Sequence, residues 1–342
     1  MRVGIPREVK DGESRVALTP LAVKEFSNVV VEPGAGGGVG FTDDDYLAAG
    51  ATLGDPWECE LVVKVKELQE SEYRKPRPGQ TVFGFQHFGP DPELLDAALA
   101  SGATFVAFET VGQASGLPIL SPMSAIAGRL AVQVGAWCLQ KQNGGSGVLL
   151  PGLDGVPAGK IVILGAGNVG ANALAVAYGI GADVTVFSRT EKPQLKARFP
   201  RAAFRTGPPA VEDADLVIAG VLTPGQMSPK LLSRATLGKM RRGSALVDVG
   251  IDQGGIAETS RPTSHSAPIY VEEGVVHYCV PNMPAACART ASLALEQAAL
   301  PYVKLLLAGT MNPDLQTGVQ VKAGKVTHEQ LARDAGRAYF RP

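Results

Sequence analysis

The hexapeptide GAGNVG at residues 165–170 has the glycine spacing of a loop that binds phosphate groups, and it follows the apolar run 160–164. In such a loop the first glycine permits a tight turn, the second lets a pyrophosphate approach the backbone, and the third lets the next helix pack closely on the strand. The N-terminus of that helix then binds the phosphates. The pattern predicts a dinucleotide site, and a plain glycine turn is the alternative. The expected cofactor-binding residues in this loop are Gly165, Gly167, Asn168, Val169 and Gly170.

The end of the next predicted strand, 184–187, bears on which dinucleotide binds. Domains that bind NAD usually place Asp or Glu there, on the ribose hydroxyls. This chain has Ser188 and Arg189 instead. Because an arginine can accommodate a 2′-phosphate and no carboxylate repels one, the pair favours NADP(H). The alternative is NAD(H), bound through the backbone and Ser188, with Arg189 in solvent.

Three other side chains follow predicted strands and suit an amino acid or 2-oxo acid as substrate. Arg15 and Lys66 are cations that could hold a carboxylate, and arginine offers a planar fork. Lys64 and Lys66 alternate to the same side of a strand, so only one of them need be functional. His87 ends the strand 81–86, and histidine suits general acid/base catalysis near neutral pH. The alternatives are a solvated Arg15 and a structural His87.

Asp252 follows the predicted strand 245–249 and precedes the pair Gly254-Gly255. It could assist proton transfer or hold a cationic amine, although a carboxylate beside two glycines is also typical of a simple turn. The other three histidines, His265, His277 and His328, show no comparable convergence. We expect them to be structural.

These residues require two α/β units to position them. Short β-branched runs alternate with helical patterns up to about residue 122 and again from 160 to 283, which predicts two parallel sheets with crossover helices. A helix over 125–141 and another over 288–307 would connect the units, with a glycine-rich loop at 144–159 and a last helix beginning near Thr327. The predicted strands are 3–5, 29–31, 61–65, 82–85, 105–108, 161–164, 184–187, 216–219, 245–249 and 278–280.

The predicted architecture is therefore two doubly wound Rossmann-like domains, joined by long helices, with a cleft between them. A substrate domain would comprise residues 1–124 and 297–342, and a dinucleotide-binding domain residues 125–296. We expect the C-terminal segment to pack back on the first domain. Ligands of open α/β sheets lie beyond the carboxyl ends of the strands, so the cleft would be the active site.

Composition restricts the class of protein. With 342 residues, 45% hydrophobic and 19% charged, and a net charge of −1, the chain is typical of a globular protein with two cores and without a nucleic-acid surface. The four cysteines form no metal-ligand spacing with the histidines, so we expect no metal, no disulfides and reduced thiols in the cytoplasm. No signal peptide is evident at the N-terminus, and the uncharged stretch 161–182 contains too many glycines and asparagines for a membrane span.

Several blocks together resemble the alanine dehydrogenase family, whose fold is shared by the NAD-binding subunit of proton-translocating transhydrogenase. They are VGIP at 3–6, ESRVALTP at 13–20, KVKE at 64–67, PMS at 122–124, AGR at 127–129, IDQGG at 251–255 and NMP at 282–284. The resemblance implies reversible oxidative deamination of L-alanine to pyruvate and ammonia, with hydride transfer to a nicotinamide cofactor. Arg15 and Lys66 would bind substrate, His87 would be the acid/base, and Asp252 would assist. Further residues would contact the cofactor or line the reaction site: Ser124, Leu222, Asn282 and Met283.

The sequence departs from the family at points that touch substrate and cofactor. Gln86 precedes His87, Ala125 follows the PMS block, Pro281 precedes Asn282, and Ser188 stands where the family places the ribose-binding aspartate. A second hypothesis is therefore an NADPH-dependent imine or 2-oxo-acid reductase of related fold acting on another amino acid. A third is a non-catalytic dinucleotide-binding homologue. The resemblance also implies a homo-oligomer, a hexamer as in the family or a dimer as in its transhydrogenase relatives.

Overall fold

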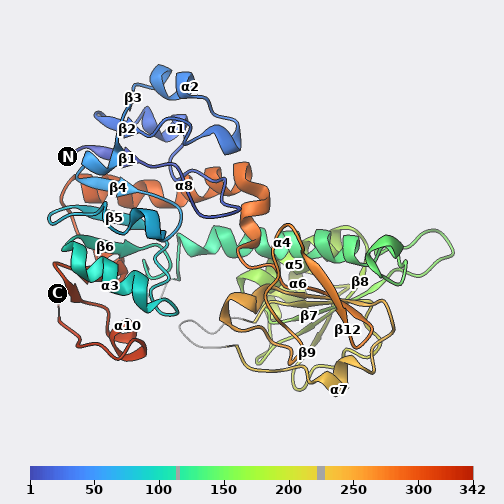
Figure 1. Ribbon diagram of the computed structural model, residues 1–342. Helices are drawn as coiled ribbons and strands as arrows, with labels where there is room; N and C mark the ends of the chain where they lie inside the picture. Colours follow the sequence, from blue (N-terminus) through green and yellow to red (C-terminus); the bar gives the residue numbers. More distant parts are fainter. Residues whose placement is uncertain (113–115, 222–227, 342) are drawn as a thin grey trace. The chain divides into compact units, whose positions relative to one another are not determined.

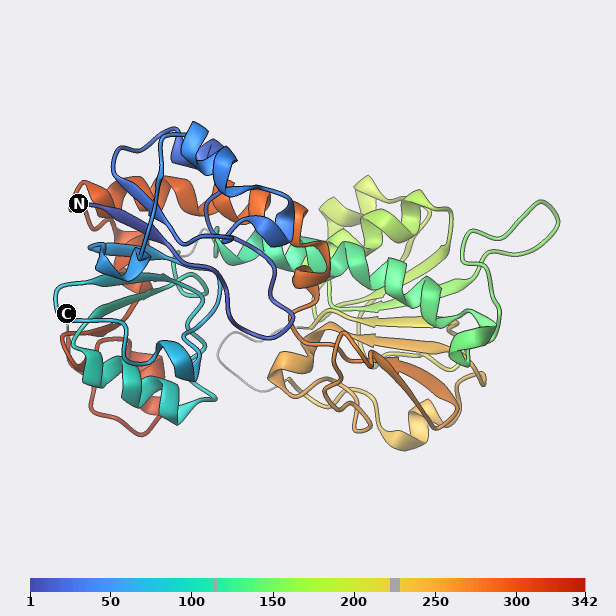
Figure 2. The ribbon, with the colours of Figure 1, turned by 45° about the horizontal axis from the view of Figure 1, so that its top comes forward.

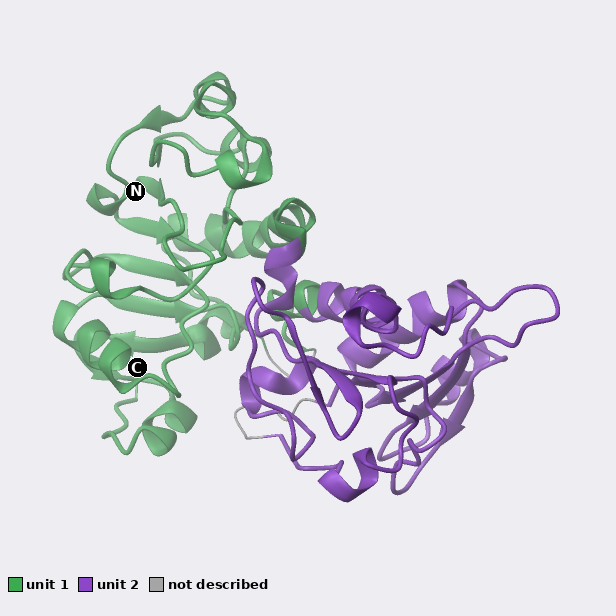
Figure 3. Cartoon of the chain, turned by 45° about the vertical axis from the view of Figure 1, so that its right-hand side comes forward, with its two compact units in different colours: residues 1–123, 287–342 green, residues 124–286 purple. Residues whose placement is uncertain are grey.

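The computed structural model describes residues 1–112, 116–221 and 228–341. The chain forms two compact units, which Figure 3 distinguishes by colour. Unit 1 comprises Met1–Met123 and Cys287–Pro342, and unit 2 comprises Ser124–Ala286. The first boundary between the units, after Met123, lies one residue before the predicted domain boundary after residue 124. The second boundary, before Cys287, lies ahead of the predicted one before residue 297, because the whole of the helix that begins at Ala288 belongs to unit 1.

The sheet of unit 1 has the strand order β15-β14-β6-β5-β4-β1-β2-β3. Strands β1 to β6 are parallel, and β14 runs antiparallel to both β6 and β15. The chain winds outward from β1 in one direction and from β4 in the other, so the β1–β4 boundary is the topological switch point at which ligands of such sheets bind. The strands are β1 Val3–Ile5, β2 Val29–Val31, β3 Thr52–Leu53, β4 Leu61–Val63, β5 Thr81–Gly84, β6 Thr104–Ala107, β14 Val319–Lys322 and β15 Lys325–Val326.

Helices cover both faces of this sheet. Leu94 and Leu95 of α3 and Leu331 of α10 pack with Val82 and Phe105 in one buried cluster. The helix α8 lies on the opposite side of the sheet (Figure 1). The helices are α1 Pro20–Val23, α2 Asp43–Ala48, α3 Pro92–Ser101, α8 Ala288–Leu307, α9 Pro313–Gly318 and α10 Glu329–Asp334, with 3₁₀ turns at Gly37–Val39, Pro56–Glu58 and Glu70–Glu72.

The sheet of unit 2 has the order β12-β13-β11-β10-β7-β8-β9, in which only the edge strand β12 is antiparallel to its neighbour. Its switch point lies between β7 and β10, and the glycine loop at 165–170 follows β7 there. The strands are β7 Lys160–Leu164, β8 Asp183–Phe187, β9 Ala203–Arg205, β10 Leu216–Ala219, β11 Ala245–Asp248, β12 Ile269–Glu272 and β13 Val275–Tyr278.

Glycines in α4 allow the helices of unit 2 to pack closely on one another and on the sheet. A Cβ on Gly128 of α4 would lie 2.1 Å from the carbonyl oxygen of Val169, and one on Gly135 would lie 2.5 Å from Leu216 of β10. Only glycine permits these approaches, so α4 packs directly on α5 and on the sheet. Figure 2 shows α4 and α5 on one side of the sheet and α7 on the other. The helices are α4 Leu120–Cys138, α5 Asn168–Gly179, α6 Pro193–Arg198 and α7 Arg234–Leu237, with 3₁₀ turns at Lys141–Asn143, Val249–Gln253 and Met283–Cys287.

The prediction of two doubly wound parallel sheets is confirmed, and three local predictions were wrong. The strand expected at 278–280 is β13, which ends at Tyr278. The helix expected at 125–141 begins at Leu120, because Pro122 is tolerated in a first turn, and ends at Cys138. The tail after Asn312 holds α9, β14 and β15 as well as the expected helix, and β14 pairs with β6 of the first domain, as the predicted return of this segment requires.

Candidate active site

The expected catalytic side chains of unit 1 follow the carboxyl ends of its parallel strands. Lys66 follows β4, and His87 follows β5. Lys66 follows a strand that flanks the switch point between β1 and β4, and His87 follows the next strand along the sheet. Arg15 lies on the long connection that leaves β1. The sequence therefore predicted correctly which edge of the sheet these residues occupy.

Arg15 is buried, with 2% of its surface exposed, and is held by a neighbouring carboxylate. Its Nε donates to Glu13 Oε1 over 2.7 Å and its Nη2 to Glu13 Oε2 over 2.5 Å, while Nη1 lies 3.2 Å from Met123 Sδ. A solvated Arg15 is therefore excluded. Glu13 therefore binds the edge of the guanidinium formed by Nε and Nη2.

Helix α8 fixes the loop that carries Arg15. The backbone N–H of Val16 donates to Ser292 Oγ over 3.0 Å, and that of Thr19 donates to the carboxylate of Glu296. Ser292 and Glu296 are four residues apart, so they lie on the same face of the helix. A segment from the end of the chain thus sets the position of an arginine near its beginning.

The structure distinguishes the roles of Lys64 and Lys66, which the sequence alone could not do. Lys64 is 1% exposed, and its Nζ lies 3.0 Å from Glu72 Oε2 and 3.4 Å from Glu8 Oε2, so it belongs to a buried ion network. Burial alone would lower the pKa of Lys64, and the two carboxylates outweigh it and raise that pKa. Lys66 Nζ instead lies 3.8 Å from Glu67 Oε2 and 5.8 Å from the ring centre of Phe85. Lys66 is the better candidate for substrate binding.

His87 adopts a left-handed backbone conformation, with φ of 47°. Its N–H donates to Glu109 Oε1 over 2.8 Å, and its ring stacks on Phe85 with 5.7 Å between centroids. The side chain remains 41% exposed. A positive φ is uncommon outside glycine and is sustained by surrounding contacts. Glu109 supplies one of these contacts, so the backbone conformation that aims the imidazole is built into the end of β5.

Glu67 is the residue of this cluster to which the sequence assigned no role. Its Oε2 lies 2.8 Å from His87 Nδ1, and its Oε1 accepts a hydrogen bond from Lys10 Nζ. Burial by itself raises the pKa of Glu67, and the hydrogen bond with His87 and the charge of Lys66 outweigh it, so the pKa lies well below its usual range. One ionised carboxylate therefore contacts Lys10, Lys66 and His87. The signals in the sequence were its place directly after Lys66 and its inclusion in the KVKE block at 64–67.

The glycine loop of unit 2 has the geometry that its spacing predicts. Gly165 has φ of 98°, and a Cβ on Gly170 would lie 1.8 Å from the carbonyl oxygen of Gly165. A Cβ on Gly167, in contrast, would meet no atom within 4 Å. The first and third glycines are thus required by the turn and the helix packing, whereas the second faces open space at the start of α5. Asn168 and Val169 form the first turn of that helix.

Ser188 and Arg189 follow β8 at the same edge. Ser188 Oγ donates to the carbonyl oxygen of Thr190 over 2.7 Å, its N–H donates to the carbonyl of Arg205, and Arg189 is exposed. Arg205, which ends β9, is also exposed. The ends of these two strands present two arginines, and neither strand is followed directly by an acidic residue.

Asp252 lies exposed in a 3₁₀ turn after β11, and two unpredicted residues hold its loop. Asp248 accepts hydrogen bonds from Ile256 N over 2.8 Å and from Ser260 Oγ over 2.5 Å. Lys230 Nζ donates to the carbonyl oxygens of Gly254, Gly255 and Ala257 over 2.6, 2.9 and 2.9 Å. The aspartate secures amide groups of the loop and the lysine secures its carbonyls.

The remaining expected site residues have different surroundings. Ser124 lies half-buried in α4. Asn282 has φ of 54° and precedes Met283, which is 3% exposed and begins a 3₁₀ turn. Leu222 lies outside the described residues.

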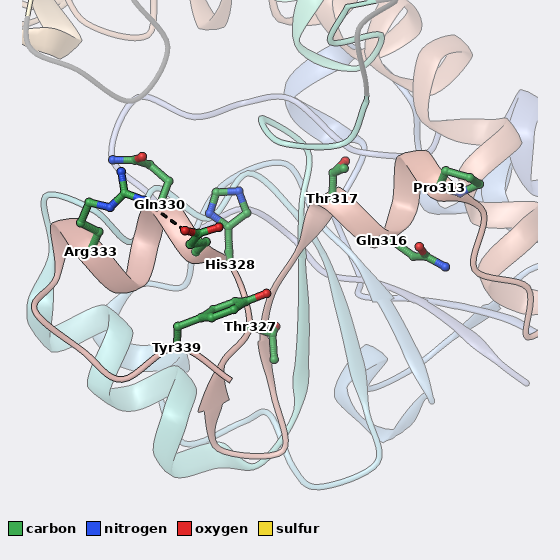
Figure 4. Close-up of a pocket in the computed structure, with 9 residues that line it drawn as sticks. Pro313, Gln316, Thr317, Thr327, His328, Gln330, Arg333 and Tyr339 are labelled. Carbon is green, nitrogen blue, oxygen red and sulfur yellow. Dashed lines mark hydrogen bonds and ion pairs between the residues drawn. The ribbon is translucent and has the colours of Figure 1, made fainter. Parts of the chain in front are cut away.

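The histidines expected to be structural include two with clear structural contacts. His277 is buried, with Nε2 2.8 Å from Thr259 Oγ1, and burial lowers its pKa. His328 Nδ1 accepts the N–H of Leu331 and caps α10. It also lines an open pocket of about 480 Å³ with Gln316, Arg333 and Tyr339 (Figure 4). None of the expected catalytic residues lines this pocket, so we do not assign the active site to it.

No helix in the described part of the chain has both the length and the apolar character to cross a membrane.

Comparison with known proteins identifies the family. Residues 4–127 match the alanine dehydrogenase/PNT N-terminal domain, and residues 131–329 match the C-terminal domain of the same family. Alanine dehydrogenases of Halomonas elongata and Bacillus subtilis are each 43% identical to this chain over 99% of its length, and the matches span 98% and 96% of those proteins.

Solved structures agree with the sequences. An L-alanine dehydrogenase structure superposes with a TM-score of 0.94 at 42% identity, covering 98% of this chain and 99% of the other. A transhydrogenase from Sinorhizobium meliloti superposes with a TM-score of 0.83 at 26% identity, covering 96% and 99%. The two doubly wound domains, the glycine loop and the matches along both domains together show that this chain belongs to the alanine dehydrogenase/PNT family.

Proposed function

We propose that this enzyme catalyses the reversible oxidative deamination of L-alanine to pyruvate and ammonia, with hydride transfer to a nicotinamide dinucleotide. The observation that carries the proposal is the cluster after β4 and β5, where Lys66 and His87 share the carboxylate of Glu67 at the switch point of unit 1. A protein that only bound a dinucleotide would have no need for this cluster. Full-length similarity to alanine dehydrogenases supports the choice of substrate.

In this proposal the groups of unit 1 bind the substrate and move its protons. The guanidinium of Arg15 binds the substrate carboxylate, and the ammonium of Lys66 binds the oxygen or nitrogen on the α-carbon. Loss of hydride from the α-carbon leaves an iminium, and His87 removes a proton from the water that attacks it. Asp252, a residue of unit 2, would assist proton transfer or hold the cationic nitrogen. In the reverse direction His87 returns the proton.

The residues of unit 2 fit a dinucleotide. The open space beside Gly167 and the N-terminus of α5 suit a pyrophosphate. The bound nicotinamide would accept the hydride. Ser124, Asn282 and Met283 would contact the cofactor. Unit 2 would be the core of the dinucleotide-binding domain, predicted at residues 125–296, and unit 1 would form the substrate domain.

We propose NADP(H) as the preferred form of the cofactor. Arg189 follows β8 and Arg205 ends β9, both are exposed where a 2′-phosphate would lie, and no carboxylate follows β8 directly. The same feature supports the second candidate function, an NADPH-dependent imine or 2-oxo-acid reductase acting on another amino acid. NAD(H) remains the alternative cofactor in either case.

We also propose that the enzyme is a cytoplasmic homo-oligomer. The antiparallel pair Leu153 and Val156, joined through Asp154-Gly155, extends from unit 2 (Figure 2). Leu149, Leu153 and Val156 are 56%, 70% and 58% exposed. Apolar side chains so exposed at one loop are typical of a surface that another subunit covers.

The test is to follow oxidation of NADH and of NADPH by the purified full-length chain with pyruvate, glyoxylate and larger 2-oxo acids, with and without ammonium. Ammonium-dependent oxidation with pyruvate is the expected result, and the faster of the two dinucleotides identifies the cofactor. Turnover restricted to larger acids would favour the second candidate. Tight dinucleotide binding without turnover on any acid would overturn the proposal.

A further inference from the structure

The contacts around His87 define which of its two ring nitrogens meets the substrate. Nδ1 lies 2.8 Å from Glu67 Oε2, and Glu67 is 7% exposed. The His87 side chain as a whole is 41% exposed. Nδ1 is therefore engaged with a buried carboxylate, while solvent still reaches part of the same side chain.

We propose that Glu67 is a positioning residue for the reaction, whose carboxylate accepts the Nδ1–H of His87 and so leaves Nε2 to exchange the proton with the attacking water. The inference rests on the proposed role of His87. In the step itself, the water oxygen bonds to the iminium carbon while the π electrons of the C=N bond move to nitrogen, and the O–H bond of water breaks as the new N–H bond forms at Nε2. Nδ1 keeps its proton throughout, and Glu67 stays ionised.

Charge also favours this arrangement. When His87 accepts a proton it becomes a cation near the ammonium groups of Lys66 and Lys10. The carboxylate of Glu67 contacts all three side chains. Among the described residues, Glu109, which accepts the His87 N–H, and Tyr73, whose pKa is raised chiefly by burial and in small part by Glu67, also lie near the Glu67–His87 pair. The ring of Phe85 covers one face of the imidazole. Without the Glu67 charge, protonation of His87 would be opposed by two ammonium groups.

Two substitutions, one at Glu67 and one at its partner Lys10, distinguish a positioning role of Glu67 from a role in packing. Glu67→Gln keeps the size of the side chain, removes its charge, and can present an amide N–H to Nδ1, which would force the other tautomer. Lys10→Met removes one cation from Oε1 without touching Nδ1. Because these changes alter the field at His87 in opposite senses, the acid limb of the pH profile of kcat/KM should move to lower pH in the first variant and to higher pH in the second.

The kinetic test compares these variants with Glu70→Gln, an exposed carboxylate three residues along the chain. Glu67→Gln should lower kcat for alanine on the order of 10²-fold, the cost of a misplaced catalytic group. Glu67→Asp should recover the wild-type position of the acid limb with a lower amplitude, and Glu70→Gln should match the wild type. A lower kcat in Glu67→Gln with an unmoved acid limb would mean a purely structural role and would overturn the proposal.

A second measurement does not depend on turnover. The chain has four histidines, so ¹⁵N-histidine labelling gives few signals, and the His87→Asn variant assigns the one of interest. We expect neutral His87 to carry its proton on Nδ1 in the wild type and to lose this preference in Glu67→Gln. A neutral His87 protonated on Nε2 in the wild type would refute the proposal. If instead the wild type shows the expected tautomer but no alanine turnover, the assignment of the substrate fails and the Glu67–His87 pair stands.

Discussion

His87 is the residue on which the proposed chemistry depends most directly. Substitution by alanine would place Ala at φ near 47°, so backbone strain would confuse the result. Asparagine tolerates this conformation and lacks the imidazole. We expect His87→Asn to lower turnover by about 10²- to 10⁴-fold, the usual contribution of general acid/base catalysis, with little change in dinucleotide affinity.

Steady-state kinetics and a dinucleotide titration check this expectation. His265→Asn is the matched control, because His265 is an exposed histidine of unit 2. Turnover near the wild-type value in His87→Asn would remove the histidine from the mechanism.

Our second prediction concerns Ser188 and Arg189, which we expect to determine the preference for NADP(H) over NAD(H). The double variant Ser188→Asp, Arg189→Ile adds a carboxylate where ribose hydroxyls would bind and removes a cation from a 2′-phosphate. A charged hydrogen bond is worth about 1.5–3 kcal/mol, so the ratio of kcat/KM for NADP(H) to that for NAD(H) should fall by at least about tenfold. Lys196→Ile, on the exposed side of α6, is the control. An unchanged ratio would show that this loop does not read the 2′-phosphate.

At the scale of the element, the loop between β11 and Ser260 is set by Asp248 and Lys230. Because Lys230 binds three carbonyl oxygens, Lys230→Met should leave them to solvent and loosen the turn that carries Asp252. We expect roughly tenfold lower kcat/KM for alanine and faster amide hydrogen exchange over residues 249–257, with global stability nearly unchanged. Lys239→Met provides an exposed lysine for comparison. Exchange as slow as in the wild type would contradict the clamping role.

At the scale of the whole molecule, we expect Lys64 to affect the stability of unit 1. Its ammonium lies between the buried carboxylates of Glu8 and Glu72, and Glu8 also accepts the N–H of Val65 over 2.6 Å. Removing one partner of a buried ion network typically costs about 3–5 kcal/mol, because the remaining charges lose their compensation. Lys64→Met should therefore lower the thermal unfolding temperature markedly, while Lys24→Met, an exposed lysine, should not. Equal melting temperatures would mean that the network contributes no net stability.

The assembly is the other property of the whole molecule. If a second subunit covers the apolar side chains at 149–156, then Leu153→Asp should bury a charge in that contact and shift the enzyme toward smaller species. Light scattering coupled to gel filtration measures the mass directly. Asp154→Asn in the same turn controls for the loop itself, and an unchanged mass in Leu153→Asp would place the subunit contact elsewhere.

The sequence by itself determined the features that depend on neighbouring residues. The glycine loop, the order of strands and helices, and the strand ends that carry Lys66 and His87 follow from local periodicity and backbone freedom, and the structure confirms them. Short edge elements such as β3, β9 and β15 were missed, because two or three residues carry too weak a pattern to be recognised.

Only the tertiary structure decided which charged groups act together. The partners of the expected site residues are contacts across the fold: Glu8 and Lys64 are far apart in sequence, Glu67 reaches His87 across two strand ends, and α8 holds the Arg15 loop. Whether a lysine becomes a buried structural ion or a substrate ligand depends on these partners, since the energy of a charge is set by its burial and by its nearest counter-charge. Lys64 and Lys66 share the same local pattern, and only the folded chain distinguishes them.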